Sequence, residues 1–410
     1  MQLPFSRPVR LVMFMFLLSV PAAFGQSADS TFYPLHPIGM AQGGSQTAVA
    51  RGYSSLFTNP AGFARTGSEL TLLSATMWVH SNPFTVPAST RALFSGDLSA
   101  NRTRVEEQFT NGGFGFGGTT GLGYVGNGVG IGVSASFDSL FAGSSFPDPD
   151  SPGDISGVLL SEISLVGGLA LPFDLGRARA SVGANIRPFV RMWAAVDDPA
   201  IAAGMIARYL GVDAGGEGAD FMQEQLVLNG FGLAFDAGAL LEWDQASVGL
   251  SVRDIGGTDL GYSRHSLERV WTSLQSGGLP APARPGDQEF VEENYRIPTT
   301  VNVGGAWHPS LTGMGRRLNP VFHAEVRDLF RIGAHDHSLG PLLHLHVGAE
   351  ATLWNTFAFR AGLYQGHPTV GGGLMLGFFH LNAAWFARET GDFPGDAPAR
   401  GAALEAAFRF

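Results

Sequence analysis

Short segments in which apolar and polar residues alternate one by one constrain this chain more than any other feature of its sequence. In the clearest, Val129 to Phe137, valine, isoleucine, alanine and phenylalanine alternate with glycine and serine. A period of two places successive side chains on opposite faces of a β-strand. We expect strands at 69–79, 114–126, 128–140, 157–173, 177–191, 230–243, 245–255, 297–308, 319–329, 342–353, 356–364, 369–377, 378–388 and 401–410. The pattern predicts an all-β protein whose sheet has one apolar and one polar face.

The connections between these segments predict a closed barrel. Tight links, such as Asn127 and Asp244-Gln245, alternate with long stretches, such as 80–113 and 192–229. Beyond the N-terminal region, no apolar run reaches the roughly 20 residues of a membrane-spanning helix. An even number of strands with short turns at one end and longer loops at the other is typical of outer-membrane barrels. Residues 69–410 are therefore expected to form a 14-stranded antiparallel transmembrane β-barrel, with its apolar face outward and, among the charged strand residues, only Asp254 on that face.

The two ends of the chain indicate export to the cell outer membrane. Arg7 and Arg10 precede a short apolar core, and small residues lead to Gly25. This arrangement predicts a signal peptide over residues 1–25, cleaved after Gly25. The last strand ends on Phe410, and such an aromatic carboxyl terminus resembles the signal that outer-membrane assembly machinery reads.

Composition argues against several other functions. The chain has no cysteine, so neither a disulfide nor a thiolate metal site is available. Its formal net charge of −10 argues against nucleic-acid binding, which needs a basic surface. We find no nucleophile elbow and no phosphate-binding loop in a strand–turn–helix context. We therefore expect a protein that is not an enzyme and has no cofactor.

The stretch before the first strand, residues 38–63, suits neither a long helix nor a sheet. Pro60 removes a backbone donor, Gly62 permits a turn, and the side chain of Asn59 can hold that turn. We predict that residues 26–68 form a compact plug of short helices and turns inside the barrel. Its gate residues are expected to be Gly39, Met40, Gly43, Asn59, Pro60, Ala61, Gly62 and Phe63.

This stretch resembles the hatch of FadL/TodX-type outer-membrane transporters, and of the related PorV-like and spirochaetal barrels. The resemblance is carried by Gly39-Met40, Gly43, 47–50 and 59–64, whereas the acidic residues expected after the alanines are replaced by Arg51-Gly52-Tyr53. It implies passive uptake of hydrophobic small molecules, such as long-chain fatty acids or related lipids.

The resemblance also implies a kink in the third strand that opens a side exit into the membrane. Gly128, Gly130 and Gly132 occupy the matching stretch. Glycine inside a strand marks bulges or a close approach of another backbone. The alternative is a glycine-lined wall that leaves room for the plug.

Ionisable residues gather on the predicted inner face of the ninth to eleventh strands. They are His323, Glu325, Arg327, His344, His346, Glu350 and Arg360. An antiparallel register could set Glu325 opposite His346, and Glu350 opposite Arg360. Charges that pair across the lumen are the favoured interpretation, so no metal is expected. A metal site and a pH-sensitive gate are the alternatives.

The long loops are unusually apolar. They contain Ile201, Met205, Ile206, Leu210, Phe221 and Met222. Apolar loops that face water need an explanation, and methionine-rich surfaces accept varied ligands. These residues are expected either to capture hydrophobic ligands or to pack as a cap on the barrel.

Two further functions remain as alternatives to transport. One is a PorV-like barrel that does not transport and serves as a partner in secretion or surface assembly. The other is a simple porin without a gate.

Overall fold

The computed structural model describes residues 36–80, 113–143, 154–198, 201–202, 221–276, 278–312 and 317–410. Within these ranges sixteen strands form one sheet. The strands are Ser68–His80 (β1), Gly115–Gly126 (β2), Val129–Ala142 (β3), Ser156–Asp174 (β4), Ala178–Val196 (β5), Leu226–Trp243 (β6), Ala246–Arg253 (β7), Thr258–Ser266 (β8), Tyr295–Ile297 (β9), Thr300–Trp307 (β10), Leu318–Val326 (β11), Leu345–Leu353 (β12), Phe357–Tyr364 (β13), His367–Leu376 (β14), Phe379–Glu389 (β15) and Pro398–Arg409 (β16). Fourteen of them correspond to the predicted segments, and β8 and β9 are additional.

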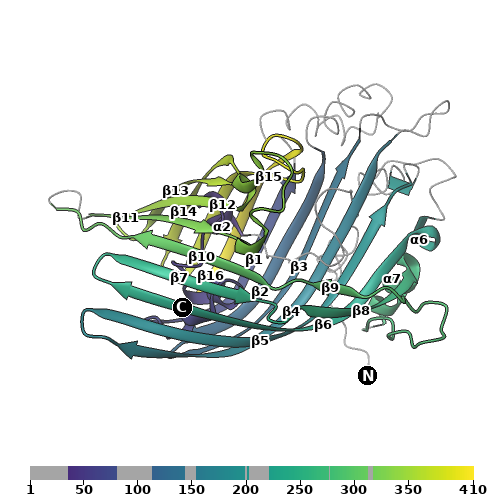
Figure 1. Ribbon diagram of the computed structural model, residues 1–410, viewed down its shortest axis with the longest axis horizontal. Coiled ribbons are helices and arrows are strands. Elements are labelled where there is room, and N and C mark those ends of the chain that lie inside the picture. Colours follow the sequence, from purple (N-terminus) through teal and green to yellow (C-terminus); the bar gives the residue numbers. More distant parts are fainter. Residues whose placement is uncertain are drawn as a thin grey trace.

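Backbone hydrogen bonds close fourteen strands into a ring (Figure 1). The ring runs from β1 to β7 in chain order, continues from β10 to β16, and closes where β16 pairs with β1. Every one of these pairings is antiparallel. β8 pairs with β6 beyond the end of β7, and β9 pairs with β8. The predicted 14-stranded antiparallel barrel is therefore confirmed.

The two ends of the barrel differ in their connections. At the end that we call the turn end, Asn127-Gly128 joins β2 to β3, with φ angles of 54° and 80°. Such left-handed pairs make tight hairpin turns whose twist matches the strands. The chain enters β1 and leaves β16 at the same end, where the backbones of Leu70 and Phe410 exchange two hydrogen bonds of 2.8 and 2.9 Å. The opposite end, with the longer connections, is called the loop end.

The alternation in the sequence becomes two faces of the barrel wall. Outward side chains are large and exposed, for example Leu169 and Leu171, which are 65% and 62% accessible. Inward positions are polar, and Arg187, Arg191 and Arg360 are buried against carboxylates. In a barrel that spans a membrane, an arginine on the outer face at mid-depth would cost about 2–4 kcal/mol. Burying the charges inside avoids this cost.

Asp254 corrects the predicted assignment of faces. Strict alternation placed it outside, but its side chain is 1% exposed and lies inside the barrel. The pairing register of β6 shifts between β7 and β8, and Asp254 lies in this break with a φ of 51°. The left-handed backbone interrupts the alternation, so the carboxylate turns inward to Arg187, 3.0 Å from its Nη2.

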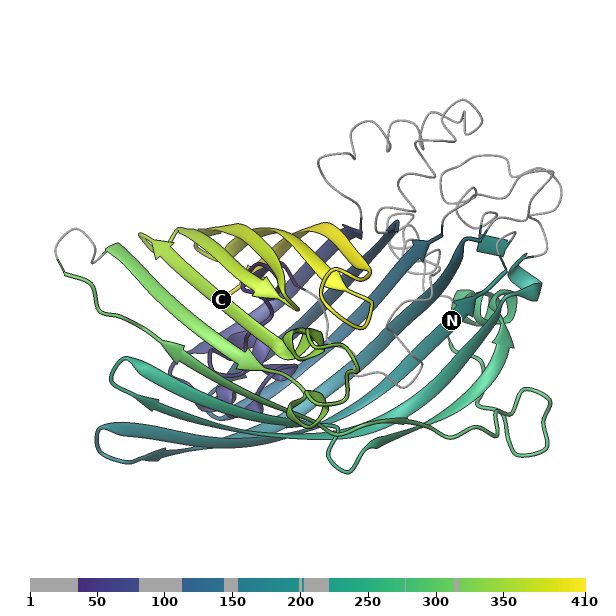
Figure 2. The same cartoon turned by 45° about the horizontal axis from the view of Figure 1, so that its top comes forward.

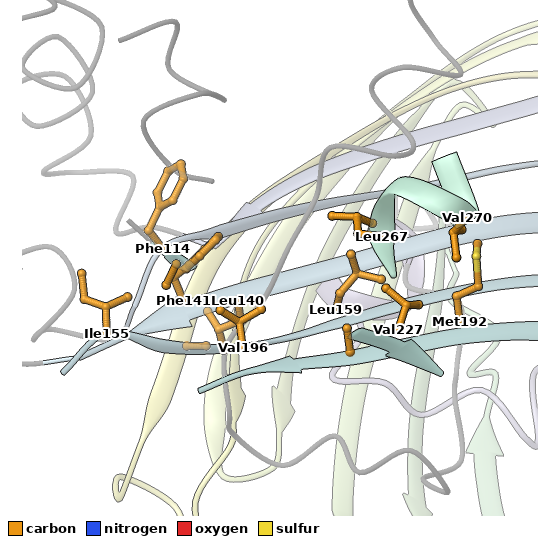
Figure 3. Packing of buried hydrophobic residues seen from close by; sticks show 13 residues of the cluster. Phe114, Leu140, Phe141, Ile155, Leu159, Met192, Val196, Val227, Leu267 and Val270 are labelled. Atoms are coloured by element: carbon orange, nitrogen blue, oxygen red, sulfur yellow. The ribbon is translucent and has the colours of Figure 1, made fainter. Parts of the chain in front are cut away.

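Two helices lie at the loop end beside β6 and β8. They are Phe221–Glu224 (α6) and Leu267–Gln275 (α7), and Leu267 and Val270 of α7 pack against Met192 and Val227 of the strands (Figure 3). Ser266 caps the start of α7, accepting a hydrogen bond from the amide of Arg269. Among the described residues, every helix is too short or too polar to cross a membrane.

The residues from 36 to 66, here called the N-terminal segment, lie inside the ring. Their helical turns are Pro37–Ala41 (α2), Gly52–Leu56 (η1) and Pro60–Ala64 (η2). α2 contacts β13 to β16, η1 contacts β1 to β3, and η2 contacts β2 to β6. In Figures 1 and 2 the purple segment accordingly lies between the blue strands and the green and yellow strands.

Candidate functional site

Local sequence determines where α2 begins. His36 precedes α2 with an extended backbone, and its Nδ1 accepts a hydrogen bond of 3.2 Å from the amide of Gly39. Pro37 follows at the first helical position, where a missing N–H costs nothing. Burial lowers the pKa of His36, so the ring is held in the neutral form that can accept this bond.

Asn59 joins the two halves of the segment to each other and to the wall. Its Oδ1 accepts from the amide of Ala61, 3.1 Å away, which caps η2 just before Pro60. Its Nδ2 donates to the backbone oxygens of Thr47 at 3.0 Å and of Ala239 in β6 at 3.2 Å. The side chain is fully buried. The predicted turn at Asn59 is therefore present, and its amide also ties the segment to the barrel.

Two arginines hold the end of the segment near the turn end. The Arg65 Nη2 donates to the backbone oxygen of Ala48 at 2.8 Å and lies 3.1 Å from Oε1 of Glu242. The Arg179 Nη2 donates to the backbone oxygen of Ala64 at 2.9 Å. The sequence interpretation placed Arg179 and Glu242 inside the barrel but did not anticipate that they bind this segment.

A carboxylate of the wall binds the middle of the segment. Oε2 of Glu325 accepts from the backbone amides of Gln46 and Thr47, at 2.6 and 2.7 Å. Its Oε1 accepts from Nε of Arg327 at 3.0 Å, and that guanidinium also donates to the backbone oxygen of Gly44. Two consecutive amides aimed at one buried carboxylate oxygen form a charge-assisted contact, among the stronger hydrogen bonds in proteins.

A second carboxylate holds the segment one strand further on. Oε2 of Glu350 accepts from Nε2 of Gln42 at 3.0 Å and from Nε of Arg360 at 2.6 Å. On the same strand, Nδ1 of His346 lies 2.7 Å from the backbone oxygen of Gly43. The wall charges therefore neutralise one another and bind the segment at the same time.

The two predicted cross-strand pairs are present. Glu325 lies opposite His346 between β11 and β12, and Glu350 lies opposite Arg360 between β12 and β13. His323 shares the inner face of β11, is buried, and neither ring nitrogen has a hydrogen-bond partner among the described residues.

His344 is the member of the predicted cluster that lies elsewhere. It ends a short turn, Gly340–His344 (η5), before β12 begins. Its Nε2 is 2.8 Å from Nε2 of His335, and its Nδ1 is 2.9 Å from the backbone oxygen of Arg327. Within the described ranges, no three histidine, cysteine or acidic side chains are grouped to hold a metal ion.

Inward-facing glycines of the wall make room for the N-terminal segment. A Cβ built on nine of the described wall glycines would come closer than 3.0 Å to atoms of the segment. They are Gly121, Gly130, Gly132, Gly183, Gly238, Gly249, Gly348, Gly362 and Gly371. For Gly183 the nearest atom is the backbone oxygen of Pro60, and for Gly249 it is that of Thr47, each 2.5 Å away. The segment therefore fits closely against the strands that carry these glycines, which are β2, β3, β5 to β7 and β12 to β14.

The third strand is continuous where the side exit was predicted. The pairing of β3 with both β2 and β4 runs without a register shift, so the ladder has no bulge at Gly130 or Gly132. Gly130 instead faces the ring of Phe63, and Gly132 faces Leu56. Gly128 lies in the hairpin turn, where its amide donates to the backbone oxygen of Phe63 at 3.0 Å. All three glycines therefore contact the N-terminal segment closely.

Two of the apolar loop residues have described side chains. Ile201 and Met222 pack against a buried cluster that includes Phe141, Leu159 and Met192. For these two, packing at the loop end is what the structure favours. Met205, Ile206 and Leu210 lie outside the described residues, as does the side chain of Phe221.

A cavity of about 520 Å³, lined by both charged and apolar side chains, runs along one side of the segment. At the turn end it is lined by His308, Asn355 and His380, and towards the loop end by Arg327 and Tyr364. Five arginines and three glutamates line it, together with apolar side chains of the segment. The sequence interpretation did not foresee this cavity, because the path of the segment decides which wall residues it leaves uncovered.

A buried ionic network at the break between β7 and β8 was also missed. Arg187 lies 3.2 Å from Oδ2 of Asp236 and 3.0 Å from Oδ1 of Asp254. The hydroxyl of Thr258 donates to Asp254 at 2.9 Å, and that of Thr299 donates to its backbone oxygen at 2.8 Å. These side chains connect the wall where the backbone ladder is interrupted.

Comparisons with known proteins find similarity only at the level of structure. Neither a family model nor a curated protein matches the chain. The toluene transporter TbuX of Ralstonia pickettii is 12% identical, with a TM-score of 0.47 over 92% of this chain and 98% of that one. The toluene transporter TodX of Pseudomonas putida is 11% identical, with a TM-score of 0.44 over 93% and 98%. A Pseudomonas aeruginosa FadL homologue is 13% identical, with a TM-score of 0.43 over 95% and 99%.

Proposed function

We propose that this chain is an outer-membrane transport protein for the passive uptake of hydrophobic small molecules, with long-chain fatty acids or related lipids as the substrate class. The observation that carries the proposal is a closed barrel, apolar outside and ionic inside, with the N-terminal segment held across its lumen. The hatch-like motif of that segment supports the choice of hydrophobic substrates.

The N-terminal segment serves as the gate in this proposal. The part of the segment from Pro60 onward is anchored, because Pro60 packs against Gly183 of β5 and Gly238 of β6. Its first part borders the cavity, which gives residues 38–51 space into which they can move. Asn59 lies between the two parts and donates to both Thr47 and Ala239. Opening therefore consists of moving the first part about Asn59-Pro60, and no energy source is implied.

The route of the ligand follows from this arrangement. Apolar side chains of the loop end capture the molecule, which then reaches the N-terminal segment. Because β3 is unbroken, exit along the cavity to the turn end is better supported than exit through the wall at Gly130. With an exported chain, the turn end faces the periplasm.

Export and assembly complete the proposal. A signal peptide over residues 1–25 directs the chain out of the cytoplasm. The aromatic ring of Phe410 is 59% exposed on the outer face and stacks on Phe378 at 5.4 Å. A terminal side chain left accessible in this way is suited to recognition by the outer-membrane assembly machinery.

Purified protein in liposomes tests this function. We expect long-chain fatty acid to enter protein-containing vesicles faster than protein-free ones, and a lipid extract of the purified protein to contain a co-purifying amphiphile by mass spectrometry. Failure to bind or pass any fatty acid or hydrocarbon offered contradicts the proposal.

A second function is favoured by one observation, the close fit of the N-terminal segment to the wall glycines. A segment that never moves suits a PorV-like partner barrel in secretion or surface assembly. In that case the barrel co-purifies with a partner protein, and fixing the segment in place does not change the binding of that partner.

A further inference from the structure

The barrel wall is higher on one side than on the other. On the high side, β4, β5 and β6 contain 19, 19 and 18 residues. Across the ring, β11, β12 and β13 contain 9, 9 and 8 residues, and the difference is plain in Figure 1. β7 and β10 are short as well, but β8 and β9 continue the sheet beyond them. The section from β11 to β13 is therefore the low side of the wall.

Tryptophans at the turn end give the two sides a common base. Trp243 ends β6, Trp354 lies between β12 and β13, and they are 38% and 57% exposed. Exposed aromatic residues of a membrane barrel gather at the interfaces between lipid and water. From this level, at about 3.4 Å per residue and a tilt of about 40°, β6 rises about 47 Å and β13 about 21 Å. The apolar band of such a barrel is about 25 Å high, so β6 ends far above it and β13 ends within it.

Exposed charges on the high side indicate that it rises into water. β8 pairs with the loop-end part of β6, and β9 pairs with β8. Asp259 of β8 and Arg296 of β9 are 64% and 56% exposed and form an ion pair of 3.5 Å. Charged side chains on the lipid-facing surface of a barrel are destabilising. This part of the outer surface therefore lies outside the hydrocarbon.

The connection above β11 and β12, residues 327–344 and here called the low rim, has a different character. It contains Leu329–Arg331 (η4) as well as η5. Four of its large apolar side chains are exposed, namely Leu329, Phe330, Leu339 and Leu342, at 40%, 77%, 45% and 40%. The chain then enters β12 at Leu345, which faces outward and is 40% exposed. The apolar outer surface of the low side thus continues into the low rim.

Lipid is the environment that suits the low rim. A group of exposed apolar side chains marks a contact with a partner or a membrane. The height of the low side places this group at the upper edge of the hydrocarbon. Arg331, beside Phe330, is 62% exposed and lies 3.8 Å from Asp328. A long arginine side chain can bury its stem in lipid and keep its charge among the headgroups.

The cavity beside the N-terminal segment reaches the low rim. Arg327, the first residue of the low rim, lines the cavity, and so does Tyr364 at the loop end of β13. Ile38 and Met40 of the segment line the same space with apolar side chains. A molecule that crosses the low rim therefore arrives at the cavity without passing the high side.

We propose that the low rim lies in the outer leaflet of the membrane and that hydrophobic molecules dissolved in this leaflet enter the cavity over it. The partner of Phe330 and its neighbouring leucines is then lipid, as it is for the outward Leu345 and Leu363. A ligand on this route avoids transfer from hydrocarbon into water, which is unfavourable for apolar surface. The entry route rests on the proposed transport function, whereas the depth of the low rim can be measured without it.

Spin labels measure the depth of the low rim. Because the chain has no cysteine, Phe330→Cys and Leu226→Cys each provide a single labelling site. Leu226 is the matched control, since it starts β6 on the high side and is 49% exposed. In phospholipid vesicles, oxygen concentrates in the hydrocarbon and a nickel chelate stays in water. We expect the label at 330 to collide more often with oxygen than with nickel, and the label at 226 to show the reverse. Collisions mainly with nickel at 330 overturn the inference, whether or not the protein transports.

Uptake measures the entry route. Palmitate is supplied dissolved in the membrane of liposomes that contain trapped albumin, and the protein-dependent part of its uptake is recorded. Phe330→Asp places a carboxylate in the low rim, which resists burial in hydrocarbon, and is expected to reduce this uptake severalfold. Leu226→Asp, on the high side, is expected to leave it unchanged. Both variants are checked for the normal heat-modified mobility of the barrel on gels.

The outcomes separate the entry route from the transport function. Uptake by Phe330→Asp at the wild-type rate overturns entry over the low rim while transport stands. If the wild type shows no protein-dependent uptake of any fatty acid or hydrocarbon, the transport function fails and the entry route with it. The spin labels still decide the depth of the low rim in that case.

Discussion

The carboxylate of Glu325 accepts a hydrogen bond of 2.6 Å from the backbone amide of Gln46, although 279 residues separate them in the chain. The contact joins the ninth strand of the ring to the middle of the N-terminal segment. Sequence alternation places Glu325 only on the polar inner face of the barrel. In the structure its side chain also binds the N-terminal segment. The same holds for Glu350 and Arg179.

Replacing Glu325 by glutamine is expected to loosen the N-terminal segment without unfolding the barrel. The amides of Gln46 and Thr47 lose a charged acceptor, at a cost of about 1–3 kcal/mol. Hydrogen exchange of residues 44–50 measures the effect, and the heat-modified mobility of the barrel on gels is expected to stay normal. Glu268→Gln, on the exposed side of α7, is the control. Unchanged protection of residues 44–50 would contradict the assigned role.

Acidification is expected to destabilise the start of the segment through His36. Burial lowers its pKa, so the folded state favours the neutral ring. Its contribution to stability is present above the unfolded value of about 6.5 and is lost as the pH falls below it. Protease sensitivity of residues 36–44 is expected to rise between pH 7.5 and pH 5.

The control for this prediction is His36→Asn. Asparagine caps a helix without titrating, so Gly39 keeps an acceptor at every pH. If the variant shows the same pH-dependent sensitivity as the wild type, the effect arises from another group and the assignment to His36 is wrong.

Valine at Gly183 is expected to displace η2. Its Cβ would come within 2.5 Å of the backbone oxygen of Pro60, and a backbone atom cannot move aside as a flexible side chain does. Gly167, in the adjacent strand β4, has nothing within 4 Å of its Cβ position and provides the matched control. We expect Gly183→Val to increase proteolysis of residues 57–66 and Gly167→Val to leave it unchanged. Equal proteolysis of residues 57–66 in the two variants would show that the close contact between Gly183 and Pro60 does not hold η2 in place.

Removing the charge of Asp254 is expected to weaken the barrel wall at the break between β7 and β8. Breaking a buried ion pair from one side costs about 3–5 kcal/mol, since Arg187 stays buried. Asp254→Asn should therefore unfold at a lower urea concentration. Asp259→Asn, whose side chain is 64% exposed, should unfold as the wild type does. A midpoint for Asp254→Asn that equals the wild-type value would show that Asp236 and Glu162 suffice to neutralise Arg187.

Much of the wall could be predicted because a barrel strand is a local pattern. Alternation located the strands, and it also fixed the face of Glu350 and Arg360, which the register then pairs. One feature could not be predicted in this way. Asp254 lies where a left-handed residue interrupts the alternation, and the side that a residue faces beyond such a break depends on tertiary contacts.

The site was harder to predict than the wall, because it is made by contacts that are distant in sequence. The alternation identifies the inward glycines, but only the path of the segment decides that Gly249 meets Thr47 and Gly348 meets Gln42. His344 was assigned to a strand because the apolar residues around it alternate, whereas Gly340-Pro341 starts a short helical turn there instead. The cavity beside Arg51 is what remains uncovered once all these contacts are made.

Whether the N-terminal segment must move for transport can be tested with one disulfide. The chain has no cysteine, and a Cβ on Gly304 of β10 would lie 3.6 Å from the Cβ of Ala48, within the roughly 3.5–4.5 Å that a disulfide requires. Uptake of fatty acid is measured in liposomes containing the double variant Ala48→Cys/Gly304→Cys, oxidised and then reduced, with each single variant as a control. The account predicts that oxidation abolishes uptake, that reduction restores it, and that the single variants transport normally under both conditions. Undiminished uptake by the fully oxidised double variant would contradict it.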